Sequence, residues 1–271
     1  MFGTGLIVFR ETLEAALFVG ILAAATRSIE QRTRWLTLGI ALGVLGSLTL
    51  AALMEPIGQW ANGLGQEWVN AGILSTALLM LAWHTIWVSA HAQQMTQDAK
   101  RLGARAARDS NTLWAVALAV AMTVLREGAE TVLFVAGLVT GSTDGLGAMM
   151  IGALLGLGLG VGVGWLIYSG LGHVQPRRLF AVTNVMVLLL AGHLASQLAK
   201  TLQQAGWYPD LADQAWDSSS LLSNDSLMGV LLHGLVGYEA HPSQLQVLFY
   251  VLTSVLIGLS ARHIRLRHAK R

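Results

Sequence analysis

Two segments of this chain place the same charged pattern inside long apolar runs. Residues 9–19 read FRETLEAALFV and residues 125–135 read LREGAETVLFV, so each contains Arg-Glu-x-x-Glu followed by x-x-Leu-Phe-Val. An ionised carboxylate in the middle of a bilayer is costly, so such a group is rarely kept there without a function. A set of three charges that occurs twice in one arrangement therefore indicates a pathway for an ion.

The rest of the chain has the composition of a membrane protein. Of its 271 residues, 54% are hydrophobic and only 12% are charged, whereas soluble domains carry about 25% charged residues. The chain has no cysteine, which excludes a disulfide framework, an iron–sulfur cluster and thiolate metal ligands. Its pI of 9.2 would suit a nucleic-acid-binding protein. The basic residues are distributed as membrane loops, however, so we expect no nucleic-acid partner.

Seven segments have the length of about 20 mostly apolar residues that a membrane-crossing helix needs. They are residues 4–26, 36–54, 69–91, 112–140, 146–168, 179–202 and 244–262. The first segment resembles a signal peptide, but no basic region precedes it and charges interrupt its apolar run, so we expect a retained helix. The sequence thus predicts an all-α polytopic membrane protein with seven transmembrane helices, forming one domain over residues 1–271.

The loop charges predict the orientation of these helices. Fourteen of the 17 Lys and Arg residues follow the first, third, fifth or seventh segment, whereas the opposite loops are acidic. Because basic loops stay on the cytoplasmic side, we expect an N-terminus outside and a cytoplasmic C-terminus. The basic cluster at 262–271 then lies at the cytoplasmic surface, where the bilayer is its partner through anionic lipid.

The first three segments are repeated in the next three. The two charged motifs align at an offset of 116 residues, the Gly-x-x-x-Gly patterns at 39–43 and 152–156 correspond, and His84 matches His193. Because three is odd, the second copy is predicted to be inverted, as in many secondary transporters whose ion site lies near the midplane between the repeats. The expected parts are repeat 1 at about 1–95, repeat 2 at about 112–202, an outer loop at about 203–243 and an additional helix at about 244–262.

The spacing within each motif gathers its charges on one helix face. Arg10, Glu11 and Glu14 fall within an arc of roughly 100°, and Arg10 can hold Glu14 at i,i+4. The second motif repeats this arrangement with Arg126, Glu127 and Glu130. Four carboxylates and two guanidinium groups make an anionic, oxygen-rich site of the kind that hard cations prefer. The alternative is a set of salt bridges that only lock helices together, but four carboxylates exceed what two arginines need.

The paired motifs on a seven-span scaffold resemble the oxidase-dependent iron permease family over nearly the whole chain, and the outer segment 216–238 is similar to its bacterial members. The resemblance implies uptake of iron across the bacterial inner membrane, usually as Fe(III) supplied by an extracytoplasmic oxidase, peroxidase or iron-binding protein. It also implies that Glu11, Glu14, Glu127 and Glu130 bind iron, supported by Arg10 and Arg126. The chain has Thr12 where the family more usually has Gly. Some relatives are thought to handle other metals, including lead.

Other polar residues leave further interpretations open. His84 and His193 could carry protons or bind metal, but a hydrogen-bonded histidine inside the bundle is the simpler interpretation. Asp217 and Asp225 in the outer loop could collect cations, or the loop could be a solvated cap with interfacial aromatic residues. A membrane-embedded metalloenzyme is a third class of function. The chain has no His-Glu-x-x-His or Gly-x-Ser-x-Gly motif, so we expect no enzyme and no bound cofactor, with iron as the transported substrate. The oligomeric state stays open.

Overall fold

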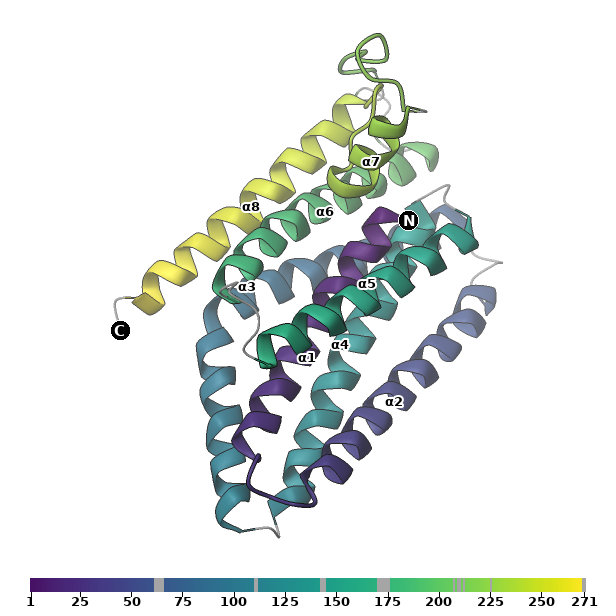
Figure 1. Cartoon of the computed structure of the whole chain (residues 1–271). Helices are drawn as coiled ribbons and strands as arrows, with labels where there is room; N and C mark the ends of the chain where they lie inside the picture. The colour runs from purple at the N-terminus through teal and green to yellow at the C-terminus, as the bar shows by residue number, and fades with distance from the viewer. Residues whose placement is uncertain are drawn as a thin grey trace.

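The computed structural model describes residues 1–60, 66–109, 112–141, 145–169, 176–206, 208, 211, 213–224 and 226–269. Regular structure in this part of the chain is helical, without a strand (Figure 1). In chain order the helices are α1 (Phe2–Ala25), α2 (Arg32–Trp60), α3 (Gln66–Arg108), α4 (Leu113–Gly141), α5 (Leu146–Tyr168), α6 (Pro176–Gln204), α7 (Leu227–Val236) and α8 (Gln244–Ala269).

Every expected span matches one of these helices to within one residue or falls inside it, and five helices in the described part of the chain are long and apolar enough to cross a membrane. The five stretches are Arg32–Leu53, Trp68–Trp87, Gly147–Tyr168, Asn184–Gln204 and Gln244–Ile264. The other two, α1 and α4, have 24 and 29 residues, but each contains the three charges of a motif. The number of seven spans, and their orientation in the membrane, therefore remain predictions.

Two helical features differ from the expected segments. Helix α3 continues for 43 residues, well past the expected end at 91, and changes direction along its length (Figure 1). Within the outer loop the structure adds α7, whose first turn is capped by the Ser226 hydroxyl accepting a hydrogen bond from Gly229 N at 3.0 Å. Gly237 ends this helix with a φ of 72°, a conformation that favours glycine.

Large apolar side chains are exposed on the outward faces of the long helices, and most charged side chains of the motifs lie inside. Leu45, Leu154, Trp165 and Leu259 are exposed, whereas a charged group such as Arg10 is buried. This distribution is the reverse of that in a soluble protein and suits a bundle surrounded by lipid.

Close glycine contacts pair α1 with α5 and α2 with α4. Gly156 of α5 lies against the backbone of Gly5 and Phe9 in α1, and Gly152, Gly160 and Gly164 follow along α1 in the same direction. Gly39 and Gly43 of α2 pack in the same way along α4. Each pair therefore runs parallel, and the small residues allow the backbones to approach closely.

The two pairs use corresponding residues. Gly160 of α5 packs against Thr12 of α1, and Gly128 of α4 packs against Ser47 of α2. The offset of 116 residues relates Thr12 to Gly128, and an offset of 113 relates Ser47 to Gly160. In the first pair the larger residue, Thr12, lies on the helix that carries the motif, and the glycine lies on its partner. In the second pair the glycine lies on the motif helix instead, so the glycine of α5 provides the space for Thr12.

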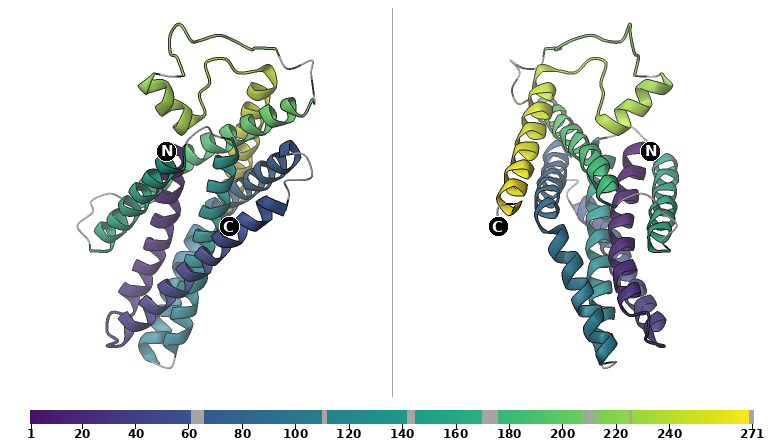
Figure 2. Two further views of the ribbon diagram at one scale, coloured as in Figure 1. Left: turned by 90° about the vertical axis from the view of Figure 1, so that its right-hand side faces the viewer. Right: turned by 60° about the vertical axis from the view of Figure 1, so that its left-hand side comes forward.

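Helices α1 and α4 cross the centre of the molecule in opposite directions, and α3 and α6 lie beside them (Figures 1 and 2). Their contact region is an apolar core that includes Ile7, Leu74, Phe134, Leu190 and Leu194. This core lies on one side of the charged motifs of α1 and α4, and a second apolar core that includes Leu22, Leu36, Val116 and Val120 lies on the other side.

The segment that carries α7 lies at the end of the molecule where α1 begins (Figure 1). Glu239 ties this segment to the bundle, because its carboxylate accepts hydrogen bonds from Lys200 Nζ of α6 at 3.0 Å and from Gln246 Nε2 of α8 at 2.7 Å. The segment is therefore attached to two of the long helices through one side chain.

Candidate metal-binding site

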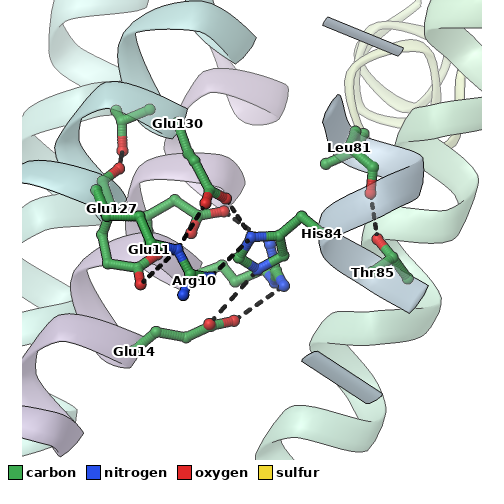
Figure 3. A network of polar contacts seen from close by, with 10 residues as sticks. Arg10, Glu11, Glu14, Leu81, His84, Thr85, Glu127 and Glu130 are labelled. Carbon is green, nitrogen blue, oxygen red and sulfur yellow. Dashed lines mark hydrogen bonds and ion pairs between the residues drawn. The ribbon is translucent and has the colours of Figure 1, made fainter. Parts of the chain in front are cut away.

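Three helices bring a cluster of potential metal ligands together in the centre of the bundle (Figure 3). Glu11 comes from α1, His84 from α3, and Glu127 and Glu130 from α4. Each of the four offers one ligand atom, these atoms all lie within 4.8 Å of one another, and all four residues are buried. The two motifs, 116 residues apart in sequence, therefore meet in one place.

The first motif is held by a fully enclosed arginine. The Arg10 side chain is only 1% exposed, and its Nη1 donates a hydrogen bond to Glu11 Oε1 at 2.7 Å. Its Nη2 forms an ion pair with Glu14 Oε1 at 2.9 Å. The guanidinium thus lies between both carboxylates of its own motif, and its contact with Glu14 is the i,i+4 pair that the helical spacing predicts.

The second motif is arranged differently. Arg126 Nε donates a hydrogen bond to Glu130 Oε1 at 3.0 Å, but it lies 3.8 Å from Glu127 Oε1. The Arg126 side chain is 34% exposed, and its guanidinium carbon lies 5.1 Å from the centre of the Trp87 ring. The two arginines correspond in sequence, but only Arg126 is partly accessible.

His84 connects the two motifs (Figure 3). Its Nδ1 contacts Glu130 Oε2, and its Nε2 lies 3.6 Å from Glu14 Oε2, so one imidazole lies between carboxylates of α1 and α4. The matching His193 lies elsewhere, where its ring packs edge-to-face against His233 with the ring centres 5.0 Å apart. Only one of the two corresponding histidines therefore belongs to the cluster.

Two carboxylate oxygens in the cluster have no partner. Glu11 Oε2 and Glu127 Oε2 are buried, and neither has a hydrogen bond within the described part of the chain. A buried oxygen without a partner is unfavourable, so these two atoms are available to coordinate a cation. Carboxylates joined by an imidazole form a ligand set that suits iron and other borderline or hard cations.

A cavity of about 560 Å³ lies beside the cluster. Its lining combines apolar side chains with three members of the site: Leu79, Met80, Trp83, Trp87, His84, Arg126 and Glu130. The second motif therefore faces open space. Trp87 was not among the residues indicated by the motif, because only the folded arrangement of α3 and α4 brings it to Arg126.

Of the two outer-loop acids singled out by the sequence, the structure describes Asp217, which is not part of this cluster. Asp217 is exposed, and its Oδ1 accepts hydrogen bonds from the amide and the hydroxyl of Ser219 at 2.9 and 2.6 Å. These hydrogen bonds hold the pKa of Asp217 below its usual value, and His241 Nδ1 lies 3.3 Å from the same oxygen. Asp225 lies outside the described residues.

Comparison with known proteins gives matches over nearly the whole chain. Residues 1–268 match the model of the Iron permease FTR1 family. The ferrous iron permease EfeU of Escherichia coli O6:H1 is 31% identical over 270 residues, covering 95% of each chain. The protein of the same name from Yersinia pestis is 31% identical over 271 residues, covering 95% of this chain and 92% of its own. No solved structure matches. With two Arg-Glu-x-x-Glu motifs in one buried cluster and a match from end to end, the chain belongs to the Iron permease FTR1 family.

Proposed function

We propose that this multi-pass protein of the bacterial inner membrane imports iron through the buried cluster formed by its two motifs. In this proposal Glu11, Glu127 and Glu130 coordinate the ion. Glu14 and His84 link the motifs, and Arg10 and Arg126 compensate the charge of the site when it holds no ion. The cluster is a transport site, so its ligands must hold the ion well enough to admit it and weakly enough to release it.

The observation that carries the proposal is the pair of unpartnered oxygens, Glu11 Oε2 and Glu127 Oε2. One belongs to each motif, and both residues contribute to the group of ligand atoms within 4.8 Å. If the motifs only formed salt bridges that lock helices together, the unsatisfied second oxygen of Glu11 and of Glu127 would have no explanation. A cation between the two helices would satisfy both oxygens at once.

The helix packing supports a transport mechanism of the alternating-access type. Helices α1 and α4 run in opposite directions, and each packs in parallel against the second helix of the other half through corresponding residues. An inverted repeat of this kind allows the halves to exchange conformations, so that a site between them faces one side of the membrane and then the other. The seven-span arrangement with a cytoplasmic C-terminus is part of this proposal.

The oxidation state of the transported iron is a separate question. The motif resemblance implies Fe(III) delivered by an extracytoplasmic oxidase or peroxidase, whereas the relatives are named ferrous iron permeases. We propose Fe(III) as the transported form, supplied by such a partner, because the cluster presents mainly carboxylate oxygens, and hard cations prefer oxygen ligands. Fe(II) is the alternative, and the imidazole of His84 would suit it.

Uptake of radioactive iron into proteoliposomes tests the proposal. The purified protein should accumulate iron above protein-free liposomes, and Glu127→Gln should remove the difference while it is reconstituted in equal amount. Parallel assays with ascorbate-reduced Fe(II) and with Fe(III)–citrate identify the transported form, and competition by Pb²⁺ and Mn²⁺ measures selectivity. Uptake by Glu127→Gln at the native rate would contradict the proposed site.

A further inference from the structure

The arginines of the two motifs correspond in sequence but have different surroundings. Arg10 is enclosed between Glu11 and Glu14 and is not among the residues that line the cavity. Arg126 lines the cavity, is 34% exposed, and donates one hydrogen bond within its own motif, to Glu130 at 3.0 Å. The two guanidinium groups therefore have different freedom to move.

The contact between Arg126 and His84 adds little to the attachment of Arg126. Arg126 Nη2 lies 3.4 Å from His84 Nδ1, and this His84 Nδ1 also contacts Glu130 Oε2. If His84 Nδ1 donates its proton to Glu130, it has no lone pair to accept a hydrogen bond from Arg126. Glu130 is then the main polar partner of Arg126 within the cluster, and Glu130 is also a proposed ligand of the ion.

We propose that Arg126 is the exchangeable counter-ion of the site and that Trp87 is the positioning residue that receives it. This inference rests on the proposed function. When the metal ion binds, Glu130 turns from the guanidinium to the metal, and the Arg126 side chain moves toward the cavity. There the ring of Trp87, now 5.1 Å from the guanidinium carbon, becomes its principal partner.

The electrostatics of the site favour this exchange. A guanidinium and a metal ion beside one carboxylate repel each other, so the arriving ion weakens the hold of Glu130 on Arg126. A cation over the face of an indole ring is attracted by its quadrupole, more strongly when no anion neutralises the cation. Trp87 therefore stabilises the metal-bound state more than the metal-free state. When the ion leaves, Arg126 returns to Glu130 and assists release.

Equilibrium binding of Co²⁺ to the purified full-length protein in nanodiscs tests the exchange. The exchange and a merely structural role of Arg126 predict changes in affinity of opposite direction. Removing the competing charge with Arg126→Gln should tighten Co²⁺ binding about tenfold. A structural role for Arg126 predicts weaker binding instead. Arg126→Lys keeps the charge, and an ammonium group can also lie over an indole ring, so this variant should bind within about twofold of the native protein.

Changes at Trp87 test the second half of the proposal. Trp87→Leu should weaken Co²⁺ binding about threefold, because the displaced guanidinium loses its ring partner. In the double variant with Arg126→Gln, the change at Trp87 should have no further effect, since no guanidinium remains to be received. Trp114→Leu is the control, because Trp114 lies on α4, the helix of Arg126, and is 59% exposed, but does not line the cavity.

The outcomes separate this inference from the proposed function. Loss of Co²⁺ binding in Glu127→Gln, together with tighter binding in Arg126→Gln, supports both. If Glu127→Gln loses binding but Arg126→Gln binds more weakly than the native protein or equally well, the counter-ion role is overturned and the site stands. Native affinity in Glu127→Gln would place the metal elsewhere and overturn both. If Trp87→Leu binds like the native protein, or weakens binding equally with and without Arg126, the role of Trp87 is overturned.

Discussion

Gly128 of α4 lies so close to Ser47 of α2 that a side chain at position 128 would overlap the Ser47 hydroxyl. Gly128 directly follows Glu127 in the second motif, and its position on the helix faces away from the two carboxylates of that motif. The close approach of α2 therefore fixes the helix that presents the ligands. On α1 the equivalent residue is Thr12, and Gly160 of α5 provides the space instead.

We expect Gly128→Ala to lower the stability of the protein by about 1–3 kcal/mol, because the added methyl group overpacks the contact with Ser47. Thermal unfolding of the purified protein in detergent, followed by circular dichroism, measures the change. The double variant Gly128→Ala, Ser47→Gly should recover most of the loss, since it reproduces in α2 and α4 the arrangement already present between Thr12 and Gly160.

Gly158→Ala provides the control for this experiment. Gly158 lies in the middle of α5, and a methyl group there would meet nothing within 4 Å. The exchange should leave the melting temperature unchanged or raise it, because alanine favours the helix by about 0.5–1 kcal/mol over glycine. Equal losses in Gly128→Ala and Gly158→Ala would mean that the close contact of α2 and α4 is not the cause.

The course of most helices could be predicted from the sequence, because runs of apolar residues long enough to span a bilayer have few other folded forms. The contact between the two motifs could also be predicted, because charged side chains within apolar membrane helices almost always pair with one another. The extension of α3 to Arg108 could not be predicted from apolar length alone, because residues 92–108 include five charged residues. Their helical conformation is favoured by helix propensity and by packing, since Ala99 and Ala106 are buried in an apolar core.

The central position of His84 and the difference between the two arginines depend on packing. His84 and His193 match in sequence, yet only His84 lies between Glu14 and Glu130, because α3 and α6 pack differently against the motif helices. A repeat in the sequence predicts equivalent roles, and the additional helix α8 beside α6 breaks that equivalence. The cavity beside Arg126 likewise arises from the spatial relation of α3 to α4.

Replacing the second glutamate of either motif should abolish iron uptake. Glu14→Ala and Glu130→Ala each remove a group that contacts both His84 and the arginine of its motif, so the remaining charges lose their arrangement. Iron uptake by proteoliposomes should fall to the level of empty liposomes, with equal amounts of reconstituted protein. Glu30→Ala is the control, because Glu30 is exposed between α1 and α2, and it should transport at the native rate.

Asp and Gln replacements at Glu11 and Glu127 should distinguish a ligand from a structural carboxylate. Aspartate keeps the charge but withdraws the oxygen by about one carbon–carbon bond, so a ligand role predicts weaker metal binding. Glutamine keeps the length and one carbonyl oxygen but loses the charge, so a ligand role predicts a larger loss. Glutamine variants with native Co²⁺ affinity would show that the carboxylates only hold the helices together.

The histidines offer a matched pair across the two repeats. His84→Phe keeps a planar ring of similar size but removes both nitrogens near Glu14 and Glu130, so Co²⁺ affinity should fall by at least about tenfold. His193→Phe makes the same change at the corresponding position, where the ring packs against His233, and should leave Co²⁺ affinity unchanged. A similar loss in both variants would place His193 on the metal pathway and would contradict the single cluster.

The orientation predicted from the basic loops can be measured with single cysteines, because the chain has none of its own. Leu221 lies in the segment between α6 and α7 and is 89% exposed, and the Arg101 side chain near the end of α3 is 73% exposed. In intact cells an impermeant thiol reagent should label Leu221→Cys and leave Arg101→Cys unlabelled until the membrane is opened. That result places the beginning of α1 and the attached α7 segment on the outer side, so iron would approach the cluster from the N-terminal end of α1. Labelling of Arg101→Cys in intact cells would reverse the predicted orientation and, with it, the side from which iron reaches Glu11.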